Sequence, residues 1–493
     1  MLRQFTQILV LFYFSCGLYS QQVHILQSTD IHSCIFDGES HHNGSWLRMA
    51  TKIKNLRQKY KKENTLLIDC GDTIQGSLSG YLSQGQAAIE MLNHLNYDAW
   101  VPGNHELDFG SSRFEELANK TTIPMLSANF RFTNDNAPRF LPWKTYRRAG
   151  KNICVIGMQA SYLAHWSYGS QFKDCSVSPA ITTLKKIIPK IQLEQPDYII
   201  LAMHHGLVAK DSRGVNEALA ISRLFPEIKL ILGGHTHRSI PGLLTSSKVY
   251  YVQAGQHAEQ LGHITIDLQT DKIESELITI NEATPTDPEA MKLMSSLKQK
   301  YAIFKVSEIC QLKLPIKHGR PGINCQISAL IAEAIRRKTN AHFALHGRFS
   351  ATSLGGIVTE QKLFDLCPYE NTIFTAELNH DELQMIMQEQ LTQIKSYSFN
   401  APHRFKAIVT KNNKLIKLEL PGSSKKVTRY KVAFNSRLAA DGGGRFPLFK
   451  KIISQPQAKL TEHRITTREA IRDILRNNPP STFNASIIRV TTK

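Results

Sequence analysis

The sequence Gly103-Asn104-His105-Glu106-Leu107-Asp108 places an amide oxygen, an imidazole and two carboxylates within six residues. It follows Tyr97-Asp98-Ala99-Trp100-Val101-Pro102, whose composition predicts the end of a buried strand. In α/β sheets, the carboxyl ends of the strands are where ligands bind. The hexapeptide therefore marks a sheet edge at which chemistry is expected.

Five other short polar stretches in the first half of the chain have the same character. They are Asp30-Ile31-His32, Gly71-Asp72, His204-His205-Gly206, Gly233-Gly234-His235 and Thr236-His237. Apolar runs precede them at residues 23–26, 65–68, 198–202 and 228–232. Runs of this β-type composition, each ending in a potential metal ligand, predict several strands that deliver their polar residues to one place.

The donors in these stretches are carboxylate, amide and imidazole groups, without a thiolate. The candidate metal ligands are Asp30, His32, Asp72, Asn104, His204, His235 and His237. One histidine after a strand is usually structural, so the prediction depends on their joint occurrence. Seven such donors suffice for two divalent ions that share a carboxylate, and ions in such pairs lie about 3.5–4 Å apart. Part of the hexapeptide is then left for catalysis.

Helical and strand patterns alternate through this region. Apolar residues recur at helical spacing in residues 47–56, 86–95, 179–193 and 214–225, and an apolar strand that ends in a motif follows each of them. The alternation predicts a layered α/β domain with metals at one sheet edge.

The order and spacing of these motifs resemble the calcineurin-like metallophosphoesterases, and within them the secreted two-domain 5′-nucleotidases. The resemblance is strong over the first 260 residues and patchy afterwards. It implies an α/β (α+β) architecture, with a four-layer metallophosphoesterase sandwich over residues 21–280. A smaller α+β domain of the 5′-nucleotidase C-terminal type would occupy residues 306–493.

The resemblance also implies a role for each candidate residue. The first metal would be held by Asp30, His32 and His237, the second by Asn104, His204 and His235, and Asp72 would bridge the two. His105 would be the catalytic imidazole, oriented by Asp108; the alternative is that this pair caps a helix that starts near Phe109. Oxygen and imidazole ligands suit two ions of Mn, Zn, Fe or Co.

A chain of 493 residues is too long for one core and suits two domains. The periodic pattern breaks at residues 281–288, and residues 289–304 then have the spacing of one amphipathic helix, so residues 281–305 are predicted to link the domains. Residues 306–493 contain 29 Lys and Arg against 14 Asp and Glu, a net charge of +15 out of +19. Such a domain either attracts anionic partners or has a solvated basic surface.

Similarity to the nucleotidase C-terminal domain rests on residues 356–359, 367–371, 381–386 and 430–439. Tyr369 falls where the family places one of two aromatic residues that enclose a nucleobase. The second aromatic is replaced by Arg437, the family's Asn-Gly-Gly-Gly-x-Arg loop by residues 346–351, and its Gly-Gly-Asp by residues 441–445. Arg437 can still stack on a base, and Arg348 or Arg445 can bind a phosphate. The alternative is that this domain binds another phosphorylated compound, or nothing tightly.

Residues 1–20 have the layout of a secretory signal peptide, with an early arginine, an apolar core and small residues at the end. Secretion or a periplasmic location is expected, and the aromatic residues before Cys16 argue against a lipoprotein signal. No other apolar run has the length of a membrane span. Proximity in the sequence makes Cys154 with Cys175, and Cys310 with Cys325, the candidate disulfides.

Together these patterns predict an exported two-metal phosphoester hydrolase that releases phosphate from nucleotides by attack of a metal-activated water. Its partner would be a small phosphoester, and the chemistry requires no nucleic acid. The alternative within the enzyme class is a phosphodiesterase or phosphatase that acts on cyclic nucleotides, nucleotide sugars or non-nucleotide phosphoesters. A binding protein with a relic metal centre is the alternative of another class.

Overall fold

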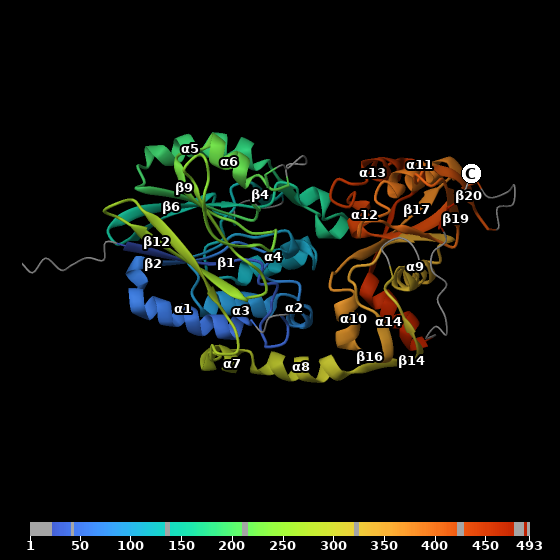
Figure 1. Ribbon diagram of the computed structural model, residues 1–493, viewed down its shortest axis with the longest axis horizontal. Helices are drawn as coiled ribbons and strands as arrows, with labels where there is room; N and C mark the ends of the chain where they lie inside the picture. The colour runs from blue at the N-terminus through green and yellow to red at the C-terminus, as the bar shows by residue number, and fades with distance from the viewer. Residues whose placement is uncertain are drawn as a thin grey trace, which may run out of the picture.

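The computed structural model describes residues 22–40, 44–133, 139–209, 215–319, 325–421, 428–477 and 488–490. Two domains lie side by side, and the helix α8 (Ser295–Val306) runs along one edge between them (Figure 1). The expected signal peptide lies outside the described residues. Within those ranges, no helix is long and apolar enough to cross a membrane.

The N-terminal domain contains two sheets that pack face to face. The first sheet has the order β13 (Ile273–Thr279), β12 (Gln260–Asp267), β1 (Gln22–Ser28), β2 (Thr65–Asp69) and β3 (Ala99–Trp100). The second has the order β10 (Ser239–Leu244), β11 (Tyr250–Ala254), β9 (Ile228–Leu232), β8 (Tyr198–Met203), β6 (Lys151–Met158) and β5 (Trp143–Arg148). β1, β2 and β3 run parallel, as do β6, β8 and β9. The carboxyl ends of several strands therefore meet at one edge.

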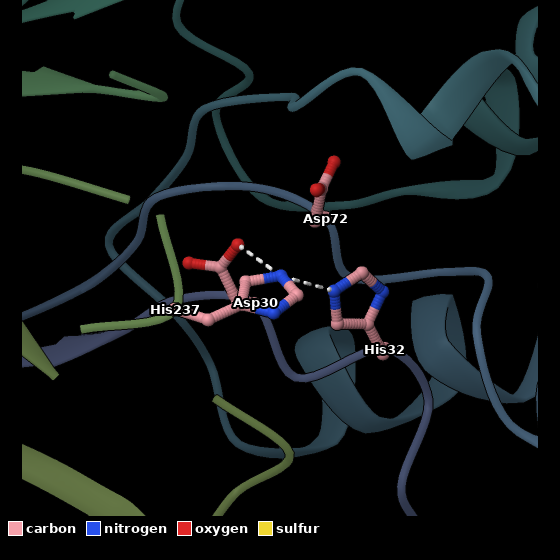
Figure 2. A group of neighbouring side chains, drawn as sticks. All are labelled: Asp30, His32, Asp72 and His237. Atoms are coloured by element: carbon pink, nitrogen blue, oxygen red, sulfur yellow. Dashed lines mark hydrogen bonds and ion pairs between the residues drawn. The ribbon is translucent and has the colours of Figure 1, made fainter. Parts of the chain in front are cut away.

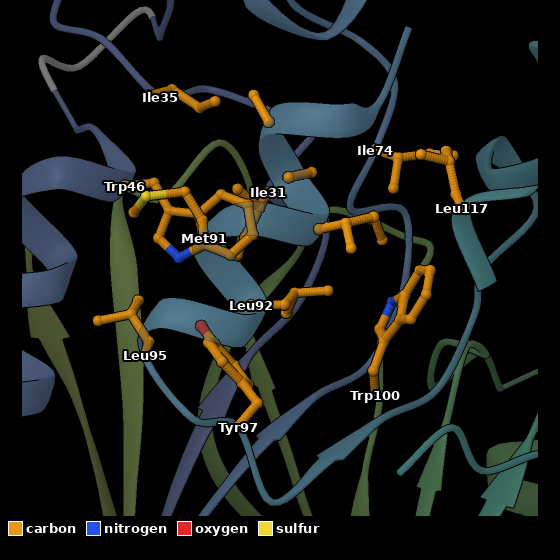
Figure 3. Packing of buried hydrophobic residues seen from close by; sticks show 14 of the residues in the cluster. Ile31, Ile35, Trp46, Ile74, Met91, Leu92, Leu95, Tyr97, Trp100 and Leu117 are labelled. Carbon is orange, nitrogen blue, oxygen red and sulfur yellow. The ribbon is translucent and has the colours of Figure 1, made fainter. Parts of the chain in front are cut away.

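Helices cover the outer face of each sheet (Figure 1). The first sheet carries α1 (Trp46–Tyr60), α2 (Leu78–Ser83), α3 (Gln86–His94) and α4 (Ser111–Lys120), and the second carries α5 (Ala180–Leu193) and α6 (Ala218–Leu224). Figure 3 shows the core under the first group, where Trp46, Met91 and Leu92 pack together. A third core fills the space between the sheets. The predicted four-layer sandwich is confirmed.

The C-terminal domain is built on a mixed sheet with helices on both faces. Its order is β18 (Ala401–His403), β15 (Phe343–His346), β21 (Tyr430–Asn435), β17 (Thr372–Leu378) and β22 (Thr461–Thr466). One core includes α9 (Gln326–Lys338), α10 (Glu360–Leu366) and α14 (Thr467–Asn477), and another includes α11 (His380–Leu391), α12 (Ser436–Ala439) and α13 (Pro447–Ile453).

Shorter strands complete the two domains. In the N-terminal domain β4 (Phe130–Phe132) pairs with β7 (Cys175–Val177). In the C-terminal domain β14 (Glu308–Ile316) pairs with β16 (Leu354–Thr359), and β19 (Lys406–Val409) lies between β20 (Leu415–Glu419) and β23 (Ile488–Val490).

The connector differs from the single helix predicted over residues 289–304. The structure has α7 (Pro288–Leu293) and then α8, with Met294 between them at φ −87° and ψ 8°. Met294 is buried in the core of the N-terminal domain, and α7 contacts α1 whereas α8 contacts α2 and α10. The chain bends so that each helix can reach its own neighbours, which periodicity could not show.

Neither candidate disulfide is present, since all seven described cysteines are free. Cys154 is buried in the core between the second sheet and α5, whereas Cys175 packs against the core of the first sheet. Cys310 and Cys325 border the same C-terminal core, and the Cys325 thiol donates a hydrogen bond to the carbonyl of His318. Proximity in the sequence was therefore the wrong guide to pairing.

Candidate metal centre

Every predicted metal ligand follows a strand of the sandwich and lies at the same edge. From the first sheet, Asp30 and His32 follow β1, Asp72 follows β2 and Asn104 follows β3. From the second sheet, His204 follows β8, while His235 and His237 follow β9. The facing sheets therefore bring residues more than 200 positions apart in sequence into one cluster.

Two groups of donors form this cluster, and both contain Asp72. One comprises Asp30, His32, Asp72 and His237, and the other comprises Asp72, His204 and His235; within each group one ligand atom per residue lies within 4.8 Å of all the others. In Figure 2 the ring nitrogens of His32 and His237 face each other, and the Asp72 carboxylate lies beside them. The fourth donor to the second group is Asn104, whose Oδ1 lies 2.9 Å from His235 Nδ1.

The hydrogen bonds of His32 and His204 leave one nitrogen of each ring for a cation. His32 Nδ1 lies 2.8 Å from the carbonyl oxygen of Gln75, and His204 Nδ1 lies 2.7 Å from that of Cys70. Because the carbonyls accept the Nδ1 protons, Nε2 of each ring carries a lone pair. The buried Nε2 of His204 lacks a hydrogen bond among the described residues, although Asp72 Oδ2 is 3.0 Å away.

These observations fit a pair of divalent cations. Nε2 of His32 lies 3.1 Å from Nε2 of His237, and the same His237 atom lies 3.4 Å from Asp30 Oδ1. Nitrogen lone pairs and carboxylates that converge in this way, with Nδ1–H groups bound to carbonyls behind them, are the usual surroundings of a bound metal ion.

The backbone at the ligands has an uncommon conformation. Five of the seven predicted ligands have positive φ angles, between 50° and 73°: Asp30, His32, Asp72, His235 and His237. Such angles cost a residue with a side chain roughly 1–2 kcal/mol and are concentrated at functional sites. Backbone hydrogen bonds hold the loops in place, since the amides of Asp30 and His32 donate to the carbonyls of Gly71 and Asp72.

Gly103 is required by the close approach of two of these loops. A Cβ at this position would lie 2.3 Å from Asp72 Oδ1 and 2.9 Å from the ring of His204. Any side chain at this position would therefore displace the carboxylate of Asp72.

Glu106 has a structural role that the motif did not reveal. Its carboxylate is fully buried and accepts hydrogen bonds from the backbone amides of Asp72, Thr73, Ile74 and Gly103. Burial and the nearby Asp72 carboxylate raise the pKa of Glu106 to about 7. Glu106 thus positions the loop of the shared ligand, whereas the sequence indicated only one more carboxylate near the site.

His105 and Asp108 lie at the mouth of the site, on the short 3-10 helix η2 (His105–Leu107) and the residue after it. His105 Nδ1 is 2.8 Å from Asp108 Oδ2, and its Nε2 is 4.0 Å from Asp72 Oδ2. Burial lowers the pKa of His105, but the Asp108 and Asp72 carboxylates outweigh it and raise the pKa to about 9. Cations bound to Asp72 would offset part of that increase.

The metal-centre residues open into a cavity of about 240 Å³ between the domains, which we call the interdomain cleft. It is lined by Asn104, His105, Asp108, Trp166, Val215, Asn216, His235, Tyr369, Asn371, Tyr397, Arg437 and Arg445. The ring of Tyr369 stacks over that of His105, with the centroids 5.8 Å apart and the planes at 17°. Arg348 lines an adjoining pocket that shares Tyr369 and Arg437 with the cleft.

Two aromatic residues of the cleft have no counterpart among the predicted residues. Trp166 lies 4.7 Å from the ring of His235, and Tyr397 comes from the loop after α11. Neither belongs to a motif, so only the fold could bring them to the site. Asp441, in the segment that replaces the family's Gly-Gly-Asp, faces away from the cleft because its Oδ2 lies 2.6 Å from His165 Nδ1 in the N-terminal domain.

Comparison with protein families gives two matches. Residues 23–239 match the calcineurin-like phosphoesterase model, and residues 316–451 match the model of the 5′-nucleotidase C-terminal domain. The chain is 23% identical over 485 residues to the trifunctional nucleotide phosphoesterase YfkN of Bacillus subtilis, covering 85% of this chain and 32% of that protein. The chain therefore spans about a third of this longer relative.

Two further similarities cover most of both chains. The human 5′-nucleotidase is 23% identical over 431 residues, which is 74% of this chain and 71% of that protein. A putative 5′-nucleotidase from Staphylococcus aureus superposes with a TM-score of 0.79 at 18% identity, covering 95% of this chain and 99% of that chain. From its two matched domains and their shared arrangement, the chain belongs to the 5′-nucleotidase family, with a calcineurin-like phosphoesterase domain followed by a 5′-nucleotidase C-terminal domain.

Proposed function

We propose that this protein is a two-metal phosphoester hydrolase that releases phosphate from nucleotides. The observation that carries the proposal is the convergence of two donor groups on the shared carboxylate of Asp72. Asp30, His32 and His237 would hold one cation, and Asn104, His204 and His235 the other. Two such cations polarise phosphoryl oxygens and lower the pKa of a bound water, which makes it a nucleophile at neutral pH.

His105 is assigned the role of the catalytic imidazole in this proposal. Asp108 faces Nδ1 and fixes the orientation of the ring, so Nε2 is the atom that can reach the substrate. A protonated Nε2 can stabilise the negative charge that develops on the phosphoryl oxygens, or donate its proton to the leaving oxygen. The helix-cap alternative accounts for neither the Nδ1 contact with Asp108 nor the position of the ring in the cleft.

A nucleotide substrate is supported by the family and by the far wall of the cleft. Tyr369 offers an aromatic face beside His105, and Arg437 and Arg348 extend the wall into the adjoining pocket. Cyclic nucleotides, nucleotide sugars and non-nucleotide phosphoesters are the second candidates, since residues 346–351 and 441–445 replace the family's loops and the Asp441 carboxylate faces His165. A relic metal centre in a binding protein would not need the His105–Asp108 pair.

The proposal is tested by phosphate release from 5′-AMP by the purified chain, measured with chelator and again after Mn or Zn is restored. Release that the chelator abolishes and the metal restores is expected. Cleavage of an aryl phosphoester while 5′-AMP is untouched would retain the hydrolase and reject the nucleotide. Absence of turnover of every phosphoester in the panel would favour the binding protein.

Export is part of the same proposal, since residues 1–20 have the layout of a signal peptide. Expression of the full chain in a secreting host, followed by mass spectrometry of its N-terminus, tests it. Removal of about 20 residues is expected, and an intact N-terminus on protein retained in the cytoplasm would contradict it.

A further inference from the structure

The interdomain cleft continues into the C-terminal domain as a pocket that the proposed chemistry does not use. We call it the arginine pocket and define it by His346, Arg348, Phe349, Tyr369, Tyr397 and Arg437. Tyr369, Tyr397 and Arg437 also line the interdomain cleft. A substrate whose phosphate lies at the metal centre can therefore extend its leaving group into the arginine pocket.

The two arginines of this pocket are partly buried and lack the carboxylate partners that two other arginines of the domain, one buried and one partly buried, have. Arg468 lies 2.6 Å from Glu370, and Arg472 lies 2.9 Å from Glu360. By contrast, the described residues place no carboxylate within ion-pair distance of Arg348 or Arg437. The buried Nη1 of Arg348 also lacks a hydrogen-bond partner there. Nη1 of Arg468 lacks a hydrogen bond among these residues too, but Glu370 balances the charge of that arginine. Because no described carboxylate balances Arg348 or Arg437 and an unpaired cation away from water is costly, an anion from outside explains the arrangement best.

Other groups of the pocket do not supply that negative charge. No carboxylate lies among its described lining residues. The nearby carboxylate of Asp441 is occupied, because Oδ2 faces His165 Nδ1 at 2.6 Å and Oδ1 accepts the amide hydrogen of Gly444. His346 is buried, and its Nε2 lies 3.1 Å from the amide nitrogen of Asn435, so this acceptor is already used and is not available to the arginines.

We infer that the arginine pocket binds a second phosphate-type anion carried by the leaving group of the substrate. This inference rests on the proposed function for the first phosphate. A guanidinium presents paired N–H donors that match phosphate oxygens, and Arg348 comes from the loop after β15 whereas Arg437 lies on α12, so the anion would be held from two sides. The preferred substrate is then a phosphomonoester with a second phosphate, in place of a nucleotide whose leaving group is a neutral nucleoside.

The test compares two adenine ligands that differ in one phosphate, 5′-AMP and adenosine 3′,5′-bisphosphate. Calorimetric titration of the full chain in chelator measures binding without turnover. The bisphosphate is expected to bind at least tenfold more tightly, because each charge-assisted hydrogen bond contributes about 1.5–3 kcal/mol. R348Q and R437Q should each remove most of this preference, and R437K should retain part of it.

The control variant is R464Q, which removes the same charge from an exposed arginine on β22. It should keep the full preference, because it lies outside the arginine pocket. Equal binding of the two ligands by the unmodified chain would overturn the inference, and so would an equal loss in R464Q, since that would indicate attraction by net charge alone.

Hydrolysis of p-nitrophenyl phosphate by the Mn-loaded chain separates this inference from the proposed function, because that substrate has no second anion. Turnover without a binding preference for the bisphosphate would overturn the inference and leave the hydrolase. A preference that depends on both arginines, in a chain without turnover, would support the arginine pocket and reject the hydrolase.

Discussion

The two ends of the interdomain cleft are constructed differently. At the metal end, all seven donors follow strands of two facing sheets, and backbone hydrogen bonds, left-handed residues and Gly103 fix their loops. At the other end, side chains project from the C-terminal domain, among them Tyr397 from a loop and Arg437 from α12, and Arg348 and Arg437 have no ion-pair partner among the described residues. We therefore expect backbone geometry to determine the positions of the metal ligands. The proposed leaving group would instead contact side chains that can be substituted one at a time.

His105 should give the largest effect on turnover at the metal end. We expect H105A to lower kcat about 10²–10⁴-fold with little change in metal content, because the ring contributes to catalysis and ligates neither cation. Phosphate release and elemental analysis of the same sample check this. H380A, at an exposed histidine of the C-terminal domain, is the control. Loss of metal in H105A would instead identify His105 as a ligand.

Glu106 should affect the metals more than the chemical step. E106Q replaces a carboxylate oxygen that accepts backbone amides with an amino group that cannot accept them, so the loop of Asp72 should shift. We expect metal affinity to fall about 10–100-fold, as it does when groups behind metal ligands are removed. Competition with a chelator measures it, and E116Q on the exposed side of α4 should have no effect. Unchanged metal affinity in E106Q would show that Glu106 does not position the loop of Asp72.

Tyr369 should affect substrate binding and leave the chemical step unchanged, unlike the residues at the metal end of the cleft. Y369A removes the ring that stacks over His105, and we expect KM for 5′-AMP to rise about tenfold while kcat changes little. Turnover of p-nitrophenyl phosphate should remain close to that of the unmodified chain. An equal loss of turnover for both substrates would show that Tyr369 orients His105. It would contradict the assignment of Tyr369 to substrate binding.

Glu333 should change the stability of the C-terminal domain without changing the metal centre. Burial raises the pKa of this carboxylate, but hydrogen bonds from His403 and from three arginines (Arg336, Arg404 and Arg337) hold it far below its ordinary value. The stabilisation is complete above the ordinary pKa of about 4.3 and is lost as the pH falls below it. We expect E333Q to lower the free energy of unfolding by about 2 kcal/mol at pH 7 and by less at pH 3. Denaturant titration at both values tests this, and a difference that grows in acid would contradict it.

The gathering of the candidate metal ligands could be predicted, because each follows an apolar run and the carboxyl ends of the strands meet at one edge. Their left-handed backbone could not, since φ angles at Asp30 or His235 depend on loops that pair across the fold. The break at Met294 was missed because apolar spacing continues through it. The disulfide candidates were wrong, because Cys154 and Cys175 lie in different cores, and Cys310 and Cys325 are both free although they border the same core.

The substrate end was harder to predict than the metal end. Tyr369, Arg348 and Arg437 came from a resemblance to a known domain, and the structure brings all three to the connected cavities. Tyr397 and Trp166 were not predicted, because a lone aromatic residue in a loop carries no periodic signal. The contact between Asp441 and His165 joins residues of different domains, so only the arrangement of the two domains reveals it.

In the proposed metal centre, two cations share the carboxylate of Asp72. Mn²⁺ titration of the metal-stripped chain, followed by electron paramagnetic resonance, tests it most directly, because ions about 3.5–4 Å apart interact magnetically. We predict two Mn²⁺ per chain with a spin-coupled spectrum, and in D72A loss of the coupling together with phosphate release. One uncoupled Mn²⁺ per chain, or full phosphate release by D72A, would contradict a two-metal centre that shares Asp72.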